Sequence, residues 1–215
     1  MINLCEKEIL RYMGYPENFE VSREQLDAID RIKEEILSVA KPKTIYKQFE
    51  IVFDDKGVMI KDSSVVLLGN DIKKHLQSSE NCIIMAATLG SEVDRTLRRI
   101  QIKSVSDGLV ADACATAYIE AICDETEKEI NGKFGLCNYR FSPGYGDFPI
   151  TQQKEILSLL DAEKKIGLLT AESNLLLPTK SVTAVMGITN THEFCDNKCN
   201  KCNRKERCAF SRYEK

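Results

Sequence analysis

The most informative stretch of this 215-residue sequence reads Arg140-Phe141-Ser142-Pro143-Gly144-Tyr145-Gly146-Asp147. Its proline fixes one φ angle and lacks a backbone donor, and its two glycines permit positive φ and close approach by a ligand. Arg140 offers a planar fork that suits a carboxylate, and Tyr145 adds a flat ring with a hydroxyl. Such a turn could hold a small zwitterion that carries an aromatic ring. Taken alone, the stretch is more typical of an ordinary loop with a solvated arginine.

Upstream of this stretch, residues 106–130 are predicted to form the longest helix, which is dense in small residues. Five positions share one of its faces at helical spacing: Ala113, Thr116, Ala117, Glu120 and Asp124. Small side chains let a ligand or another backbone approach closely, and the Glu120 carboxylate could then receive hydroxyls or an ammonium group. A closely packed helix with Glu120 at its polar margin is the simpler explanation of this segment alone.

The rest of the chain mixes helices and strands without a regular βαβ alternation, which predicts an α+β domain. Expected helices span 4–13, 23–40, 71–77, 91–102 and 151–161, and expected strands span 44–53, 57–61, 64–68, 82–87 and 181–188. Ser22 and Gln25 form a capping box before the second helix. Residues 131–149 are expected to be a loop. No glycine-rich phosphate loop follows a strand, which argues against a nucleotide-phosphate fold.

These segments together resemble the activation domain of cobalamin-dependent methionine synthase. After Arg140–Asp147 the likeness continues through Leu157-x-x-Leu160-Asp161-x-Glu163-Lys164-x-x-Gly167, Thr170-x-Glu172-Ser173, Pro178 and Ser181–Ile188. Earlier in the chain, Ala86–Arg95 and Asp112–Glu120 resemble free-standing relatives of that domain. The resemblance covers residues 5–190, and the succession of segments makes it specific, since no single motif does.

The resemblance implies a curved antiparallel sheet with packed helices over residues 1–190. It implies that Arg140, Gly144 and Tyr145 bind S-adenosylmethionine, together with a helix glutamate that Glu120 matches best. In this family, cob(I)alamin that has oxidised to inactive cob(II)alamin is reduced and then methylated by S-adenosylmethionine, which restores methylcobalamin. We therefore expect a reactivation component that does not methylate homocysteine by itself.

Two features of the sequence depart from the family. Full-length members carry an N-terminal acidic contact and a tyrosine-bearing segment after the final strand, and neither can be placed here. Homocysteine, folate and cobalamin domains are also missing from the sequence. The expected partner is therefore a separate cobalamin-binding methionine synthase polypeptide or another corrinoid protein.

Four of the nine cysteines crowd into residues 191–215, namely Cys195, Cys199, Cys202 and Cys208. Almost no apolar residue surrounds them, so four thiolates at this spacing suit one tetrahedral metal or a cubane cluster. An iron–sulfur cluster is favoured over zinc because the family's chemistry needs an electron. A zinc knuckle and a flexible tail with reduced thiols are the alternatives. His192 could replace one thiolate, although a solvated surface histidine is the simpler interpretation.

The remaining five cysteines are expected to be small buried hydrophobes, and His75 is expected on an exposed helix. The net charge of −3 argues against a nucleic-acid partner, which calls for a basic excess. No apolar run approaches the roughly 20 residues that span a bilayer, so no membrane partner is expected. The first residues lack the features of a signal peptide, and we expect a cytoplasmic protein.

Three functions compete at this point. The first is S-adenosylmethionine binding during corrinoid reactivation. The second is an iron–sulfur redox or regulatory module that delivers electrons to a corrinoid protein, and the third is an interaction protein with a structural zinc knot. Tight binding of S-adenosylmethionine would separate the first from the other two. The presence or absence of iron–sulfur absorbance would separate the second from the third.

Overall fold

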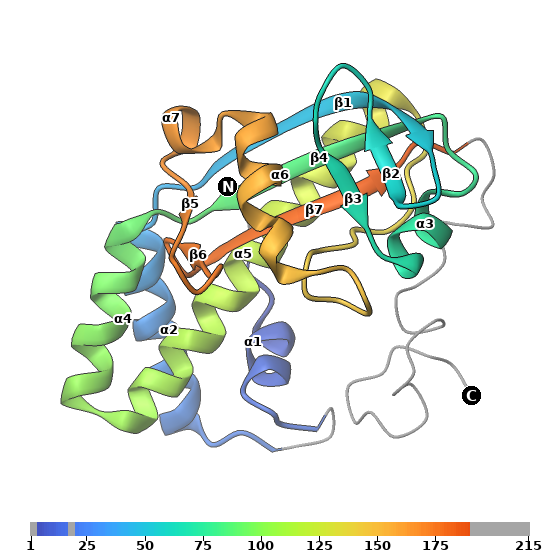
Figure 1. The fold of residues 1–215 in the computed structure, drawn as a ribbon. Helices are drawn as coiled ribbons and strands as arrows, with labels where there is room; N and C mark the ends of the chain where they lie inside the picture. The colour runs from blue at the N-terminus through green and yellow to red at the C-terminus, as the bar shows by residue number, and fades with distance from the viewer. Residues whose placement is uncertain (1–3, 17–19, 190–215) are drawn as a thin grey trace.

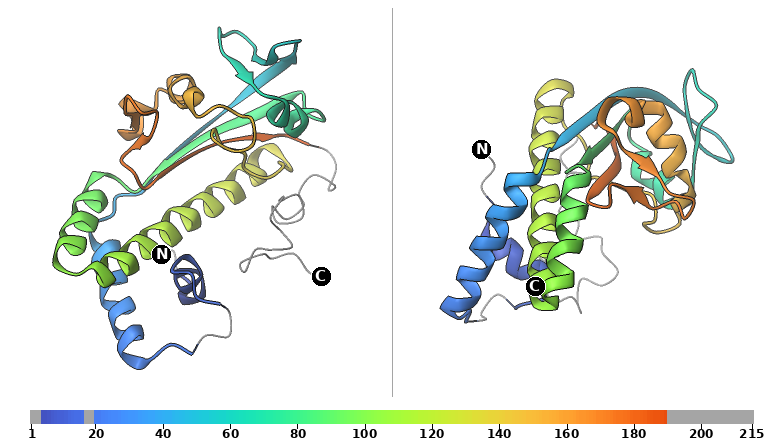
Figure 2. Two further views of the ribbon diagram at one scale, coloured as in Figure 1. Left: turned by 60° about the horizontal axis from the view of Figure 1, so that its bottom comes forward. Right: turned by 90° about the vertical axis from the view of Figure 1, so that its left-hand side faces the viewer.

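A five-stranded antiparallel sheet forms the centre of the computed structural model, which describes residues 4–16 and 20–189 (Figure 1). Its strands are β1 (Lys43–Phe53), β2 (Gly57–Ile60), β3 (Val66–Leu68), β4 (Asn81–Thr88) and β7 (Ser181–Gly187). They are ordered β3-β2-β1-β4-β7, and every neighbouring pair is antiparallel. Figure 2 shows that the sheet is strongly curved. The predicted α+β class with a curved antiparallel sheet is confirmed.

Helix α5 (Val105–Phe134) lies against one face of the sheet, where it contacts β4 and β7 (Figure 2). Three further helices pack against α5 and complete this helical layer with a shared core: α1 (Glu6–Tyr12), α2 (Arg23–Val39) and α4 (Ser91–Lys103). Strand side chains alternate between faces, so Ile83 and Met85 of β4 and Met186 of β7 point into this layer. All seven residues of β4 after Asn81 are buried, because helices lie on both sides of the strand. This burial explains why β4 reads as an unbroken apolar run.

The opposite face carries a second core beneath shorter elements (Figure 1). These are α3 (Asn70–Leu76), the 3₁₀ turn η1 (Ile150–Gln152), α6 (Gln153–Leu160), α7 (Ala162–Ile166), β5 (Leu169–Thr170) and β6 (Leu176–Leu177). Ile84 and Ala86 of β4 and Val185 of β7 face this core, and Phe148 is its largest fully buried side chain. The two cores therefore lie on opposite faces of the same two strands, β4 and β7.

The predicted elements agree with the structure in type and approximate position, with three exceptions. Helix α5 continues to Phe134, four residues past its expected end. Helix α7 and the two-residue strands of the β5–β6 hairpin were not expected. The capping box of α2 is confirmed, because Ser22 Oγ accepts from the Gln25 backbone at 3.3 Å and the Gln25 side chain accepts from the Ser22 backbone.

Two burial predictions are wrong. His75 is only 7% exposed, because α3 packs its ring against those of Tyr139 and Phe141. Cys5 is exposed because it stands at the start of α1, where Leu4 and Ile9 supply the buried contacts. The other four cysteines expected in the interior are buried: Cys82, Cys114, Cys123 and Cys137.

The cysteine-rich segment and His192 lie outside the described residues, so the metal prediction for Cys195, Cys199, Cys202 and Cys208 stays a prediction. The proposed boundary at residue 190 also stays a prediction. Within residues 4–16 and 20–189, no group of three or more His, Cys, Asp or Glu side chains is arranged to hold a metal ion. No helix in this part of the chain is long and apolar enough to cross a membrane.

Candidate functional site

Residues 137–141, expected to be loop, form a short irregular extension of the sheet beside β7. Phe141 and Val185 exchange backbone hydrogen bonds of 3.0 and 2.8 Å. Nearer the end of β7, the Asn138 backbone donates to Gly187 O, but Gly187 N donates to the Asn138 side chain at 2.7 Å. The bridges Cys137–Ile188 and Phe141–Val185 match four residue steps on the extension to three on β7. The extension therefore contains a bulge, which re-aims its side chains.

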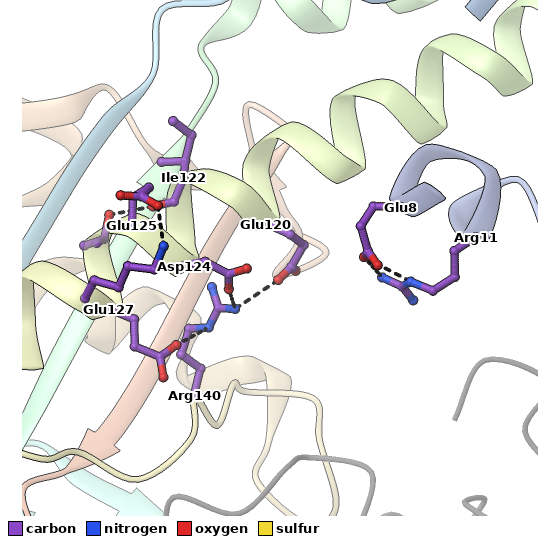
Figure 3. Close-up of polar contacts among 10 residues, drawn as sticks. Glu8, Arg11, Glu120, Ile122, Asp124, Glu125, Glu127 and Arg140 are labelled. Carbon is purple, nitrogen blue, oxygen red and sulfur yellow. Dashed lines mark hydrogen bonds and ion pairs between the residues drawn. The ribbon is translucent and has the colours of Figure 1, made fainter. Parts of the chain in front are cut away.

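The bulged extension places its side chains on two sides of the sheet. Tyr139 and Phe141 lie against α3, with their ring centroids 4.6 and 5.1 Å from that of His75. Arg140 lies on the other side, against α5 (Figure 3). This alternation is the ordinary consequence of extended backbone. It brings the arginine onto the helix face that the sequence had singled out for its small residues.

Three carboxylates of α5 surround the guanidinium of Arg140 (Figure 3). Its Nη2 lies 2.6 Å from Asp124 Oδ1 and 3.2 Å from Glu120 Oε2, and its Nε lies 3.2 Å from Glu127 Oε2. The carboxylates are four and then three residues apart, so they share one face of the helix. The Arg140 side chain is only 7% exposed, whereas Asp124 is 61% exposed. The cluster is thus anchored inside and open to solvent at its acidic rim.

The charges in this cluster do not balance, because three carboxylates face one guanidinium. Burial acts to lower the pKa of Arg140, but Cys123 and the three carboxylates outweigh it and the pKa is raised. Arg140 therefore stays charged, and two negative charges remain in surplus. Its Nη1 is buried and has no hydrogen-bond partner among the described residues. An unsatisfied buried donor costs about 1–3 kcal/mol.

The turn that follows Arg140 presents Tyr145 at the surface. Gly144 and Gly146 have φ angles of +94° and +55°, as the sequence suggested for these glycines. Gly144 N donates to Phe148 O at 2.8 Å, and Phe148 N donates to Tyr145 O at 3.0 Å. The Tyr145 residue is 65% exposed. The turn is therefore a compact, internally bonded unit with an exposed aromatic ring.

The four predicted site residues fall into two groups. Arg140 and Glu120 are in direct contact on the α5 side of the extension. Gly144 and Tyr145 belong to the turn, and the Tyr145 ring lies 6.4 Å from that of Phe141 on the α3 side. The structure thus places both groups at one edge of the sheet. Their role in ligand binding stays a prediction.

Helix α1 contributes residues that the sequence did not single out. It packs against α5, and Figure 3 shows Glu8 and Arg11 of α1 on the same side of α5 as Glu120. Arg11 pairs with Glu8 at 2.8 Å, and its guanidinium lies 4.1 Å from the Tyr12 ring centroid. Burial and the nearby Glu120 both raise the pKa of Tyr12. The Glu8 carboxylate therefore lies on the Glu120 side of α5, where it is paired with Arg11.

Comparison with known proteins identifies a similar fold. No protein-family model matches this chain, and no curated protein matches it in sequence. Among solved structures, the chain is similar to one described as the crystal structure of the MetH reactivation domain bound to AdoHcy. The TM-score is 0.64 at 15% sequence identity, over 89% of this chain and 74% of that chain. At this identity the likeness shows the fold, and it confirms the fold that the sequence resemblance implied.

Proposed function

We propose that this chain binds S-adenosylmethionine and supports the reductive remethylation of a corrinoid held by a separate protein. The observation that carries the proposal is a buried arginine donor without a partner, Arg140 Nη1, on a fold shared with a reactivation domain that binds AdoHcy. AdoHcy is what remains of S-adenosylmethionine after its methyl group has left. A fold that holds the product is therefore suited to the methyl donor.

The charges of the site fit those of S-adenosylmethionine. The ligand carries a carboxylate, an ammonium and a sulfonium, so it presents one negative and two positive groups. Arg140 supplies a donor for the carboxylate, and the surplus negative charge on Glu120 and Asp124 attracts the positive groups. Tyr145 offers an exposed ring against which a flat base can stack.

The residues of this site are suited to holding a methyl donor and need not supply a general acid or base. S-adenosylmethionine supplies an electrophilic methyl group, and its transfer to a reduced corrinoid moves no proton. Arg140, Glu120 and Tyr145 then bind and orient the donor, and the partner protein brings the corrinoid substrate. The electron that reduces the corrinoid must come from another redox group. The chain is accordingly a component of a methyltransferase system.

Calorimetric titration of the whole chain with S-adenosylmethionine tests the proposal directly. Stoichiometric binding of S-adenosylmethionine is expected, with much weaker binding of methionine, which lacks the sulfonium and the nucleoside. Transfer of labelled methyl from S-adenosylmethionine to a reduced corrinoid protein should then depend on this chain. A chain that is folded by circular dichroism but binds neither S-adenosylmethionine nor AdoHcy would overturn the proposal.

The cysteine-rich segment supports a second proposal, that Cys195, Cys199, Cys202 and Cys208 hold one metal centre. Its support is the sequence alone: four thiols within a polar segment rich in lysine and arginine. An iron–sulfur cluster there would supply the electron that reactivation needs, and zinc would give a structural knot. A redox module without ligand binding is the alternative function. A cytoplasmic location, where thiols stay reduced, fits either version.

A further inference from the structure

Helix α3 and the turn that bears Tyr145 exchange hydrogen bonds. The Asp147 carboxylate accepts from the backbone of Asn70 at 2.7 Å and of Asp71 at 2.9 Å. In return, the Asp71 carboxylate accepts from the Asp147 backbone at 3.2 Å. Gly69 stands at the N-cap of α3 and has no side chain to cap the helix. The turn therefore supplies, from far along the chain, the cap that α3 lacks.

Two glycines make room for this exchange. Gly69 has a φ of +122°, and a Cβ there would lie 2.7 Å from Asp147 Oδ1. Gly146 has a φ of +55°, and a Cβ there would overlap Asp71 Oδ2. Both positions thus combine a backbone conformation that favours glycine with the absence of space for a side chain. The close approach of α3 and the turn depends on both.

The other end of α3 is tied to the extension that bears Arg140. The Asn138 side chain donates to His75 O at 2.6 Å in a buried position. The His75 ring stacks on Phe141, with centroids 5.1 Å apart and planes inclined by 27°. Helix α3 therefore contacts the chain both before Arg140, at Asn138, and after Tyr145, at Asp147.

We propose that Asp147 is a positioning residue, which holds the Gly144–Tyr145 turn in place relative to Arg140 through Asp71 and α3. This inference rests on the proposed binding of S-adenosylmethionine. A ligand that touches both Arg140 and Tyr145 binds more tightly when the two are held at a fixed separation, because no ordering cost is paid on binding. Without the Asp147 contacts, the turn is held mainly by its own backbone bonds, and the ligand must order it.

The test compares Asp147→Ala with Asp94→Ala, a matched control on α4. The Asp94 carboxylate also accepts two hydrogen bonds, from the backbone and hydroxyl of Thr179, at 2.8 and 2.7 Å. Both variants should lose some thermal stability. Only Asp147→Ala should weaken S-adenosylmethionine binding, by about tenfold, in calorimetric titration. Asp147→Asn should recover part of the affinity, because its side-chain oxygen can still accept one bond.

Hydrogen exchange of the ligand-free chain supplies a readout that does not need the ligand. Asp147→Ala should speed exchange both at the start of α3 and in residues 144–148. Asp94→Ala should change exchange in neither segment. Unchanged exchange in these two segments would overturn the inference. A wild-type chain that binds no ligand would instead refute the proposed function, and the exchange measurement would still test the inference. Wild-type affinity in Asp147→Ala, or an equal loss in Asp94→Ala, would also overturn it. If Asp147→Ala fails to fold, Asp71→Asn takes its place in these tests, because it removes one carboxylate oxygen from the same contact.

Discussion

A guanidinium surrounded by three carboxylates is an unusual basis for recognising a ligand carboxylate. The surplus negative charge repels a second anion, and only the buried Nη1, which lacks a partner among the described residues, offsets this repulsion. In the proposed complex, the positive groups of S-adenosylmethionine would resolve the conflict, because they would be attracted to the same carboxylates. Arg140 is therefore expected to select a zwitterion with net positive charge over a simple carboxylate.

The first prediction concerns Arg140→Ala. Loss of the Arg140 side chain should weaken S-adenosylmethionine binding by about 2–5 kcal/mol, the range for breaking a desolvated pair with the ligand carboxylate. Arg140→Lys keeps the charge but lacks the planar fork, and should restore little of the affinity. Calorimetric titration measures both, and a thermal melt confirms that each variant is folded.

Arg31→Ala is the matched control for this prediction. Arg31 pairs with Asp107 at 2.9 Å on the exposed surface, and its side chain is 60% exposed. Its removal deletes an equal charge but should leave affinity unchanged, since exposed pairs contribute little. Wild-type affinity in Arg140→Ala would show that the ligand carboxylate binds elsewhere.

A second prediction concerns how the contribution of Asp147 to protein stability depends on pH. Hydrogen bonds from the backbone of Asp71 and Asn70 hold the pKa of Asp147 below its ordinary value of 3.8. A lowered pKa in the folded state contributes stability that is fully present above pH 3.8 and is lost as the pH falls through the lowered value. The stability difference between the wild type and Asp147→Asn should therefore be largest near neutral pH and shrink in acid.

Urea unfolding of both chains at pH 7 and near pH 3 measures this difference. A difference for Asp147→Asn that grows in acid would contradict the assignment.

At the level of residues, the sequence predicted part of the geometry of the candidate site, namely that Arg140 lies beside Glu120. The face bearing Glu120 and Asp124 follows from helical spacing, and Arg140 from the adjoining stretch. The arginine's burial against Glu127 could not be predicted, because it depends on pairing with β7 more than forty residues later. His75 was misassigned for a similar reason, since its ring partners lie far along the chain.

Among the elements, α5 is the one on which the site depends most. It supplies the acidic cluster, lies beneath the sheet and contacts α1, α2 and α4. Ser104 caps it by accepting from Asp107 N at 3.2 Å. At the far side, Lys180 before β7 lies 2.8 Å from both Asp112 Oδ1 and Thr116 Oγ1 of α5. These contacts fix the helix relative to β7, and hence relative to the extension that carries Arg140.

A third prediction compares the two glycines within α5. A Cβ on Gly132 would meet nothing within 4 Å, so Gly132→Ala should stabilise the protein by about 0.4–1 kcal/mol through the lower entropy of the unfolded chain. A Cβ on Gly108 would lie 3.0 Å from Gln101 Cα of α4. Gly108→Ala should therefore lose that gain and destabilise the packing of α4 against α5.

Chemical denaturation of the two variants measures the contrast under one set of conditions. The comparison is internally controlled, because the same substitution is made in the same helix. Equal stabilisation by both variants would show that α4 and α5 do not approach as closely as described. Equal destabilisation would show that the space beside Gly132 is filled.

Long elements with a clear period were predicted well, whereas α7 and the β5–β6 hairpin were missed. Buried Ile29, Ile32 and Ile36 recur at helical spacing in α2, and β4 is an apolar run bounded by polar residues. Helix α7 has five residues and the β5–β6 strands have two each, so neither displays a period. The extension at 137–141 is short and bulged, and the strand with which it pairs, β7, is distant in sequence. Such pairing is visible only in the folded chain.

On the scale of the whole molecule, the candidate site lies where three units meet: the edge of the sheet, α5 on one face and α3 on the other. All of its residues belong to the described part of the chain. Binding of S-adenosylmethionine should therefore require only residues 1–190. The cysteine-rich segment would then serve electron supply or structure, and the two functions should be separable.

The last prediction tests that separation with a chain ending at residue 190 and a full-length chain whose four cysteines, Cys195, Cys199, Cys202 and Cys208, are changed to serine. Both should bind S-adenosylmethionine as the wild type does. After anaerobic purification, only the wild type should contain metal, because thiolates bind soft or borderline metals and a short polar segment can fold around one. Loss of S-adenosylmethionine affinity in either variant would show that ligand binding depends on the cysteine-rich segment.

The identity of a metal found in the wild type would decide between the proposed roles of the segment. Iron with matching acid-labile sulfide supports an electron route to the corrinoid, and zinc alone supports a structural knot. Thiol titration of the native chain is an independent check, because Cys5 is exposed and the other four cysteines of the described residues are buried. Burial raises the pKa of Cys82 to about 12, so such thiols react slowly. Five rapidly reacting thiols, those of Cys5 and of the four cysteines in the segment, would refute a metal centre. One rapidly reacting thiol, that of Cys5, would support it.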